Sequence, residues 1–394
     1  MLIFNVLLIV LSVLGCLVYF EGRKKNIWIW IGSYLRHQWK GRPKIEPGKT
    51  IHILFCMVDH FEPIQTGSTK KQERERMSVW KSRYPLIANK HRDSNGRPWQ
   101  HTWFYPGEAY CAEYLNDLVE LCKKGFGDIE FHHHHHYETS VGLRTLINAS
   151  LDKFATHGAL KAMIDGEWKS SYGFIHGNMA LDNSRDDPKW CGVNDELIIL
   201  KETGCYADFS SPTAPCESQT EKVNSIYYAK DDPQKPKSNN TGIDVEVGRA
   251  RNGDLMIIQG PLALNWKKRK IGLFPTIDNA EILNSAPGTP DRVDRWVRQH
   301  IHVIGRPDWV FVKVSCHGAQ NENFESLLGR EADQMLEYLE KKYRDANGYK
   351  LHYVTARELF NVVYAARENC SGDPAKFMDY RIKRYEYKSP NHVR

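Results

Sequence analysis

The chain has 394 residues, 41% hydrophobic and 11% aromatic, a composition that allows a large core and excludes an intrinsically disordered protein. Its formal net charge of +6 equals the charge of the segment from Glu21 to Lys44, which has seven basic residues and one acid. The rest of the chain is balanced in charge, which excludes an extended basic surface for nucleic acid. Nine scattered cysteines without a C-x-x-C pair indicate free thiols and favour a reducing compartment.

The first 20 residues are almost wholly apolar, with Asn5 and Ser12 as the polar exceptions. In a helix they would span roughly 30 Å, the thickness of the hydrocarbon layer. No basic residue precedes Arg23, unlike in a cleaved signal peptide, so the pattern predicts a transmembrane anchor over residues 1–21. A basic juxtamembrane segment follows over residues 22–48. The positive-inside rule then favours a cytoplasmic globular part, although one span before a large domain can disobey it.

From Pro43 onward the sequence alternates between strand and helix patterns. The segment Ile51–Val58 (IHILFCMV) is almost continuously apolar, which is typical of a strand buried on both faces. Further strands are predicted at Gln100–Tyr105, Asp128–Phe131, Tyr172–His176, Cys205–Phe209, Trp309–Val314 and Leu351–Val354. Helices are predicted at Glu108–Lys124, Val141–Phe154 and Asn194–Glu202, and from Thr355 to near Glu368. Seven strands alternating with helices predict an α/β protein with a parallel sheet and favour a barrel over residues 49–370.

The segment between the fifth and sixth strands has about 100 residues, too many for one crossover. An insertion is therefore predicted over about residues 214–300. Within it, Asp231–Gly248 is largely polar, as in a long loop, and Leu255–Leu262 (LMIIQGPL) has the pattern of an inserted strand. Residues 371–394 are left as a C-terminal tail.

Ionisable side chains follow most of the predicted strands. In barrels of this kind, chemistry gathers at the C-terminal ends of the strands, so these positions are the candidate site. They are Asp59, His60 and Glu62 after the first strand, Glu108 after the second, His132 to His136 after the third, His176, Asn178 and Asp182 after the fourth, and His317 after the sixth. His176, Asn178, Asp182 and Glu108 are the predicted substrate-binding residues. Asp182 fits a turn or a helix cap equally well.

The histidine run continues the third strand and predicts a metal site. Strand alternation puts His132, His134 and His136 on one face, and a turn near His133 would still let His132 and His136 converge. Neutral imidazoles suit a divalent ion such as Zn²⁺, with Ni²⁺, Co²⁺ and Fe²⁺ as other candidates. A solvated polar loop is the alternative interpretation.

The order of elements and three short motifs resemble the polysaccharide deacetylase family. That family has a pair of aspartates after the first strand, where this chain has Asp59 and His60. It has His-x-x-x-His after the third strand, the spacing of His132 and His136. Near the end of its sixth strand it has Leu-x-His, to which the segment ending at His317 is similar, one residue longer.

The resemblance implies a distorted (β/α)7 barrel that removes acetyl groups from a carbohydrate with the help of a bound metal. It implies that Asp59 is the general base and His317 the general acid. Because His60 stands where the family has a carboxylate, the metal shell would be made of histidines alone. Its members would be His60, His132 and His136, with His134 as a further ligand.

Two segments resemble an uncharacterised bacterial branch of this superfamily more closely. They are the Asp59–Pro63 start (DHFEP) and the His352–Glu358 end (HYVTARE). The family's Arg-Pro-Pro-Tyr motif after the fourth strand is absent, which leaves the sugar open. We expect an acetylated glycan or a lipid-linked saccharide as substrate, and the bacterial inner membrane as the location of the predicted anchor.

Two other functions are compatible with the sequence. A glycoside hydrolase on a related barrel would use two carboxylates, such as Asp59 with Glu62 or Glu108, and no metal. A glycan-binding or glycan-assembly protein would keep the barrel without catalysis. Bound metal and turnover of acetylated sugars distinguish the three.

Overall fold

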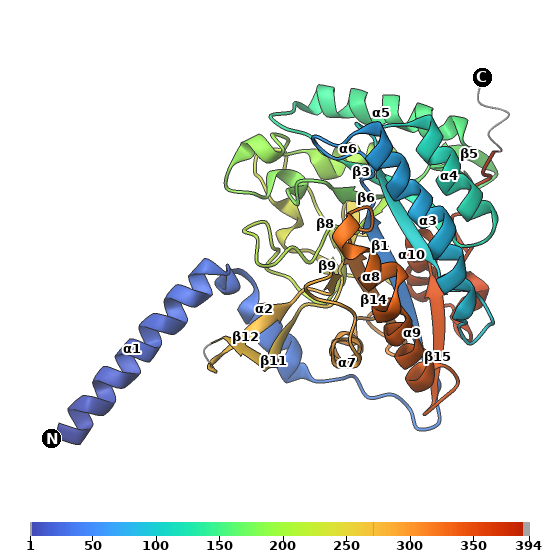
Figure 1. Ribbon diagram of the computed structural model, residues 1–394. Coiled ribbons are helices and arrows are strands. Elements are labelled where there is room, and N and C mark those ends of the chain that lie inside the picture. The colour runs from blue at the N-terminus through green and yellow to red at the C-terminus, as the bar shows by residue number, and fades with distance from the viewer. Residues whose placement is uncertain (1, 271, 389–394) are drawn as a thin grey trace.

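The computed structural model describes residues 2–270 and 272–388 and shows an α/β body from which the first helix projects (Figure 1). The helices are α1 (Leu2–Lys24), α2 (Ile27–Lys40), α3 (Lys70–Lys90), α4 (Ala112–Lys123), α5 (Ser140–Thr156), α6 (Glu196–Glu202), α7 (Pro290–Arg298), α8 (Phe324–Leu328), α9 (Arg330–Tyr343) and α10 (Ala356–Arg367). The first eight strands are β1 (Ile51–His60), β2 (His101–Pro106), β3 (Gly127–His133), β4 (Lys161–Ile164), β5 (Glu167–Ser170), β6 (Tyr172–His176), β7 (Cys205–Asp208) and β8 (Ile226–Ala229). The others are β9 (Ile243–Asp244), β10 (Leu255–Ile258), β11 (Ala263–Lys270), β12 (Phe274–Asp278), β13 (Glu281–Ile282), β14 (Trp309–Cys316) and β15 (Tyr349–Val354).

One 11-stranded sheet organises the body, in the order β13-β14-β1-β2-β3-β6-β7-β10-β8-β9, with β15 also paired to β1. The seven strands predicted from the sequence are all present as β1, β2, β3, β6, β7, β14 and β15, and they pair in parallel. The α/β class and the mostly parallel sheet are therefore confirmed.

The predicted distorted (β/α)7 barrel needs correction. Among the described residues the hydrogen-bonded path is open, with β13 and β9 at its ends. The described part of the sheet does not close into a ring. Strand β15 pairs with β1, which also pairs with β14 and β2, and at the far edge β10, β8 and β9 extend the sheet beyond β7. The sheet is curved, since side chains from β1, β7, β10 and β14 share one core.

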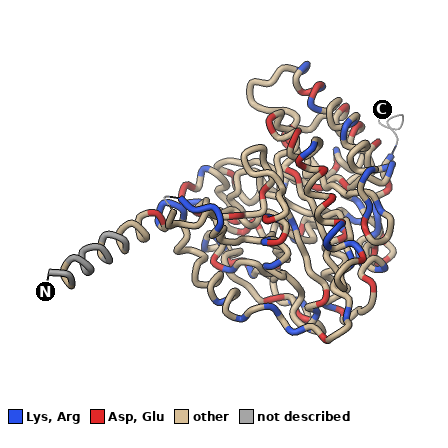
Figure 2. The backbone as a smooth tube through the Cα atoms, turned by 60° about the horizontal axis from the view of Figure 1, so that its bottom comes forward, with Lys and Arg blue, Asp and Glu red and all other residues tan. Residues whose placement is uncertain are grey.

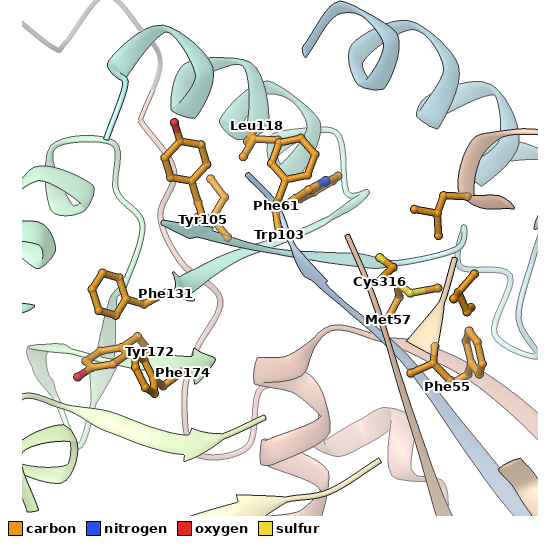
Figure 3. Close-up of a cluster of buried hydrophobic side chains, with 14 of the residues drawn as sticks. Phe55, Met57, Phe61, Trp103, Tyr105, Leu118, Phe131, Tyr172, Phe174 and Cys316 are labelled. Atoms are coloured by element: carbon orange, nitrogen blue, oxygen red, sulfur yellow. The ribbon is translucent and has the colours of Figure 1, made fainter. Parts of the chain in front are cut away.

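Strand β1 is buried on both faces, as its apolar run predicts. Ile53, Phe55 and Met57 point to the core beneath α3, α4 and α9, part of which is drawn in Figure 3. Leu54, Cys56 and Val58 point to the opposite core, which α10 also lines. Fully burying one such aliphatic side chain contributes roughly 1.5–3 kcal/mol, so β1 anchors the residues that follow it.

The segment after α1 packs against the predicted insertion. Trp30 of α2 is fully buried with Ala214, Val223 and Leu262. His37 Nε2 also lies 2.8 Å from the carbonyl oxygen of Gln299. Figure 2 shows lysine and arginine positions gathered where α1 meets the body. The predicted inserted strand is present as β10, four residues shorter at its C-terminal end than expected.

The predicted membrane anchor over residues 1–21 falls on α1, where residue 1 and the side chains of residues 2–3, 6–11, 13 and 14 lie outside the described part of the chain. No helix in the described residues is long and apolar enough to cross a membrane, which takes about 20 consecutive apolar residues. At its C-terminal end α1 instead meets the body, where Lys270 Nζ lies 3.1 Å from Glu21 Oε1. The predictions of a membrane-spanning helix, of membrane attachment through it and of a single-pass protein of the bacterial inner membrane are therefore wrong, and the cytoplasmic placement deduced from that span loses its basis.

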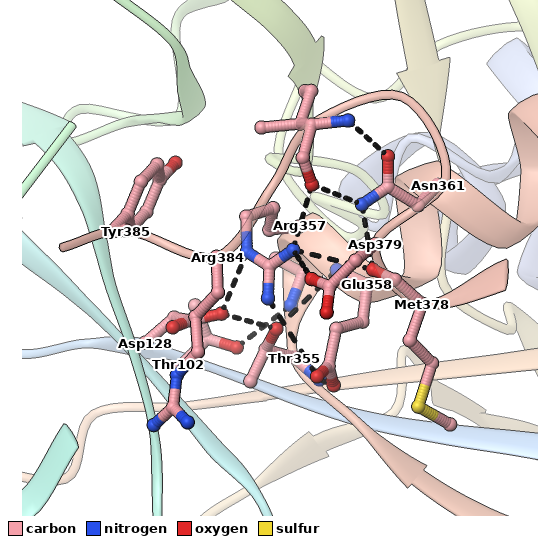
Figure 4. A network of polar contacts seen from close by, with 12 residues as sticks. Thr102, Asp128, Thr355, Arg357, Glu358, Asn361, Met378, Asp379, Arg384 and Tyr385 are labelled. Carbon is pink, nitrogen blue, oxygen red and sulfur yellow. Dashed lines mark hydrogen bonds and ion pairs between the residues drawn. The ribbon is translucent and has the colours of Figure 1, made fainter. Parts of the chain in front are cut away.

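The HYVTARE segment forms the junction between β15 and α10 (Figure 4). Thr355 caps α10, accepting from the amide of Glu358, and donates its hydroxyl proton to Asp128 Oδ2 at 2.7 Å. The Arg357 guanidinium is buried, with Nε 3.2 Å from Asp128 Oδ2. The C-terminal residues join this network, since Tyr387 donates to Asp128 Oδ1 at 3.2 Å. This motif therefore builds the fold below the candidate site.

Candidate functional site

Three side chains meet at the C-terminal ends of β1 and β3. His60 ends β1, and its ring centroid lies 4.9 Å from that of His132 near the end of β3. Glu62, two residues after β1, brings its carboxylate to both rings, and one possible ligand atom from each of the three residues lies within 4.8 Å of the others. Imidazoles from the first and third strands thus converge, together with a carboxylate that the predicted all-histidine shell does not contain.

The hydrogen bonds of His132 indicate what this cluster is built to hold. Its Nδ1 lies 3.1 Å from the carbonyl oxygen of Ile175, which can only accept, so the ring proton of the neutral form is on Nδ1. Its Nε2 then presents a lone pair 2.9 Å from Glu62 Oε1. Burial lowers the pKa of His132 below its ordinary value, so the neutral ring dominates at pH 7. Two lone pairs at this distance repel unless a cation lies between them, and two imidazoles with one carboxylate fit a divalent metal.

A third imidazole stands beside Glu62. His134 Nδ1 donates to Glu108 Oε1 at 2.5 Å, and His134 Nε2 lies 3.3 Å from Glu62 Oε1. Burial opposes protonation, but the Glu108 contact outweighs it and raises the pKa of His134 above its ordinary value. Two predicted site residues, His134 and Glu108, are therefore brought to the cluster, with Glu108 holding the imidazole.

His317 completes the cluster from the end of β14. Its ring stacks on His60 with centroids 4.5 Å apart, and its Nδ1 lies 3.2 Å from Glu281 Oε1. Burial opposes protonation, yet the Glu281 contact raises the pKa of His317 above its ordinary value. A carboxylate-oriented imidazole of this kind is suited to proton transfer, as the sequence prediction of a general acid requires.

Asp59 lies on the other face of β1 from His60. Its side chain is fully buried, where Oδ2 accepts from His101 Nε2 at 2.8 Å and Oδ1 accepts from the amide of Gly318 at 2.6 Å. Both oxygens are therefore occupied, and the second contact fixes the residue after His317. The role of Asp59 as a general base stays a prediction, while its contacts favour a positioning role.

Substitutions of Asp59 separate these two roles. In Asp59→Ala, Gly318 N–H and His101 Nε2–H lose their acceptor in the core, and we expect the free energy of unfolding in urea to fall by about 1–3 kcal/mol. Asp59→Asn keeps an acceptor for Gly318, so we expect it to retain measurable hydrolysis and bound metal. Full stability combined with abolished hydrolysis in the Asn variant would instead identify Asp59 as the base.

The structure does not bring His136 to this cluster. β3 ends at His133, and the chain turns away, leaving His136 exposed with its ring 5.6 Å from that of Trp190. The expected pairing of His132 with His136 is therefore not observed, because the intervening residues follow a loop and not a helical turn.

The predicted substrate-binding residues after β6 gather elsewhere, around His135. The His176 ring lies 4.6 Å from that of His135, and Asn178 Nδ2 donates to the carbonyl of His135 at 2.8 Å. Asp182 Oδ2 accepts from the amide of Ser238 at 2.6 Å, and burial raises the pKa of Asp182 to about 8. These residues form a buried cluster next to the candidate site.

Sequence reasoning missed three participants in the site. Glu62 was placed at the candidate site but given a role only as a glycosidase carboxylate, although its position two residues after His60 was a usable signal for a metal ligand. Glu281 belongs to the two-residue strand β13, which no periodicity marks. His101, at the start of β2, has no sequence feature that links it to Asp59.

A cavity of about 620 Å³ lies outside the candidate site. It is lined by the C-terminal half of α2 and by residues 298–304 among others. It shares no residue with the imidazole cluster. Its size and basic lining therefore say nothing about the substrate of the candidate site.

No protein-family model matches the chain, and no curated protein matches it. The resemblance to polysaccharide deacetylases stays a prediction based on short motifs. The function has to be argued from the chemistry of the cluster itself.

Proposed function

We propose that this chain is a metal-dependent hydrolase that removes acetyl groups from a carbohydrate, either an acetylated glycan or a lipid-linked saccharide. The observation that carries the proposal is the 2.9 Å approach of His132 Nε2 to Glu62 Oε1, with the ring proton of His132 held on the far side by Ile175. His60, Glu62 and His132 would hold the ion. Catalytic zinc is often held by two histidines and one carboxylate, with a position left for water or substrate.

A divalent ion held there would polarise the acetyl carbonyl and lower the pKa of a bound water. The remaining steps belong to the side chains around it. His317, oriented by Glu281, takes a proton from the attacking water and returns it to the leaving nitrogen or oxygen as its bond to the acetyl carbon breaks. His134, held by Glu108, donates a hydrogen bond to the oxyanion that develops on the carbonyl oxygen. The products are acetate and a free amine or hydroxyl.

The glycosidase alternative fits the cluster less well. Its general acid is a carboxyl group whose pKa is raised so that it stays protonated. Burial alone would do this to Glu108, but its contacts with His133 and His134 prevail and hold the pKa of this carboxyl below its ordinary value. Glu108 is therefore not prepared to protonate a glycosidic oxygen, and Glu62 is engaged at the proposed metal site.

The test is chelation and reconstitution of the whole chain. Purified protein is treated with a chelator, divided, and supplied with Zn²⁺, Ni²⁺, Co²⁺ or Fe²⁺, and acetate release is measured from N-acetylated and O-acetylated oligosaccharides. We expect release to disappear on chelation and return with at least one ion. Chelator-resistant acetate release would contradict the metal role, and release of reducing sugar ends would favour glycoside hydrolysis.

A further inference from the structure

Four metal-binding side chains converge next to the candidate site but outside it. His135, His176, Cys191 and Glu196 each offer one ligand atom, and these atoms all lie within 4.8 Å of one another. All four residues are fully buried. They come from the loop after β3, the end of β6, the loop before α6 and the first turn of α6, so the fold assembles them from four separate places.

The separations within this group match a tetrahedral site. His135 Nε2 lies 2.9 Å and His176 Nε2 lies 3.8 Å from Glu196 Oε1, and Cys191 Sγ lies 3.6 Å from Glu196 Oε2. Zinc bonds of about 2.0–2.3 Å at tetrahedral angles put neighbouring donor atoms roughly 3.3–3.6 Å apart. Shifts of about half an ångström would bring both histidine nitrogens to this distance from Glu196 Oε1, while Cys191 faces the other oxygen of the same carboxylate.

Two imidazole nitrogens in this group are left without partners. His135 Nδ1 and His176 Nε2 are buried and have no hydrogen-bond partner among the described residues. A bound ion would satisfy His176 Nε2, which faces the other ligands; His135 would bind through Nε2, so its Nδ1 would carry the ring proton. The amides of Asn178 and Ala180, 3.1 and 3.4 Å from His176 Nδ1, hold that ring with Nε2 towards the cluster. Metal binding at Nε2 puts the ring proton on Nδ1, so the two long contacts in which Nδ1 accepts are lost when the ion binds.

We propose that His135, His176, Cys191 and Glu196 form a second divalent-metal site, structural and suited to zinc. A thiolate and a carboxylate balance the two positive charges of the ion, so the buried site is neutral as a whole, as burial requires. Four protein ligands leave no open position, which is the mark of a structural zinc site. The ion ties the loop between β6 and α6 to the end of β3 and so fixes His132 and His134 three and one residues away.

Sulfur distinguishes this site from the first, whose ligands are nitrogen and oxygen only. In the cobalt-loaded whole chain we expect about two metal equivalents and a sulfur-to-cobalt charge-transfer band in the near ultraviolet. Cys191→Ser is expected to lose the band and about one equivalent. His132→Ala is expected to lose the other equivalent and keep the band. If the first site held no metal, the total would fall to about one equivalent, but the band and its loss in Cys191→Ser would be unchanged.

Two controls keep the proposal falsifiable. Cys316→Ser alters another buried thiol, close to Asp59 and His101, and should keep the band. X-ray absorption on the zinc-loaded wild type should show a sulfur neighbour at about 2.3 Å, a measurement that does not depend on whether the Cys191 variant folds. Absence of sulfur from the zinc environment, or a band that survives Cys191→Ser, would overturn the proposal.

Discussion

Replacing His132 with alanine is expected to lower kcat/KM for acetate release roughly 1,000-fold or more. A Lewis-acidic ion supplies several kcal/mol of transition-state stabilisation, and each 1.36 kcal/mol corresponds to a factor of ten in rate. In the proposed site His132 would supply a ligand atom whose direction is set by the hydrogen bond from Nδ1 to Ile175, so its loss would remove the centre of that site. Metal content and acetate release are measured on the same preparation.

Two further variants make this result specific. Glu62→Gln keeps the shape of the side chain but removes its charge, and we expect it to lose metal and activity as well. His136→Ala changes another histidine of the same run, but this residue is exposed and lies against Trp190, so both properties should remain near those of the wild type. Loss of activity in His136→Ala with retention in His132→Ala would refute the ligand assignment.

Periodicity was enough to predict the parallel strands of the sheet. The apolar run of β1 requires burial on both faces, and residues 51–58 are in fact divided between two cores. Most strands of the insertion could not be predicted from periodicity. β8 pairs with β10 and β9 over short stretches, and β13 pairs with β14 over two residues, so their places depend on tertiary contacts and not on local pattern.

The sequence predicted where the candidate site lies, but not which residues belong to it. Strand alternation already predicts that Asp59 and His60 point to opposite faces of β1. In a regular strand Asp59 as general base and His60 as metal ligand could therefore not both face one site. The sequence could not show which histidines of the run belong to which cluster, because this depends on β3 ending at His133. After that point His134 turns to Glu108, and His135 turns to Glu196.

The largest effect on stability is expected from Arg357→Ala, at about 3–5 kcal/mol in the free energy of unfolding. The Arg357 guanidinium is buried beside Asp128, and its Nη1 donates to the carbonyls of Met378 (3.3 Å) and Ile382 (2.9 Å) (Figure 4). Alanine would leave the Asp128 carboxylate buried without its cation, while the two carbonyls would keep only the Asn361 amide as donor, at 2.7 and 2.8 Å. Urea unfolding followed by tryptophan fluorescence measures the change.

Arg381 provides the matched control, since it lies between Met378 and Ile382, whose carbonyls Arg357 reaches, and it also forms an ion pair. Its Nη1 lies 2.5 Å from Asp165 Oδ1, but both side chains are exposed to solvent, at 38% and 58%. Exposed pairs contribute about 0–1 kcal/mol, so Arg381→Ala should barely change the unfolding midpoint. Arg357→Lys keeps the charge beside Asp128 but loses the planar fork that also reaches the two carbonyls, and it should fall between the two alanine variants. Equal effects of the two alanine substitutions would mean that the HYVTARE segment does not stabilise the fold through this arginine.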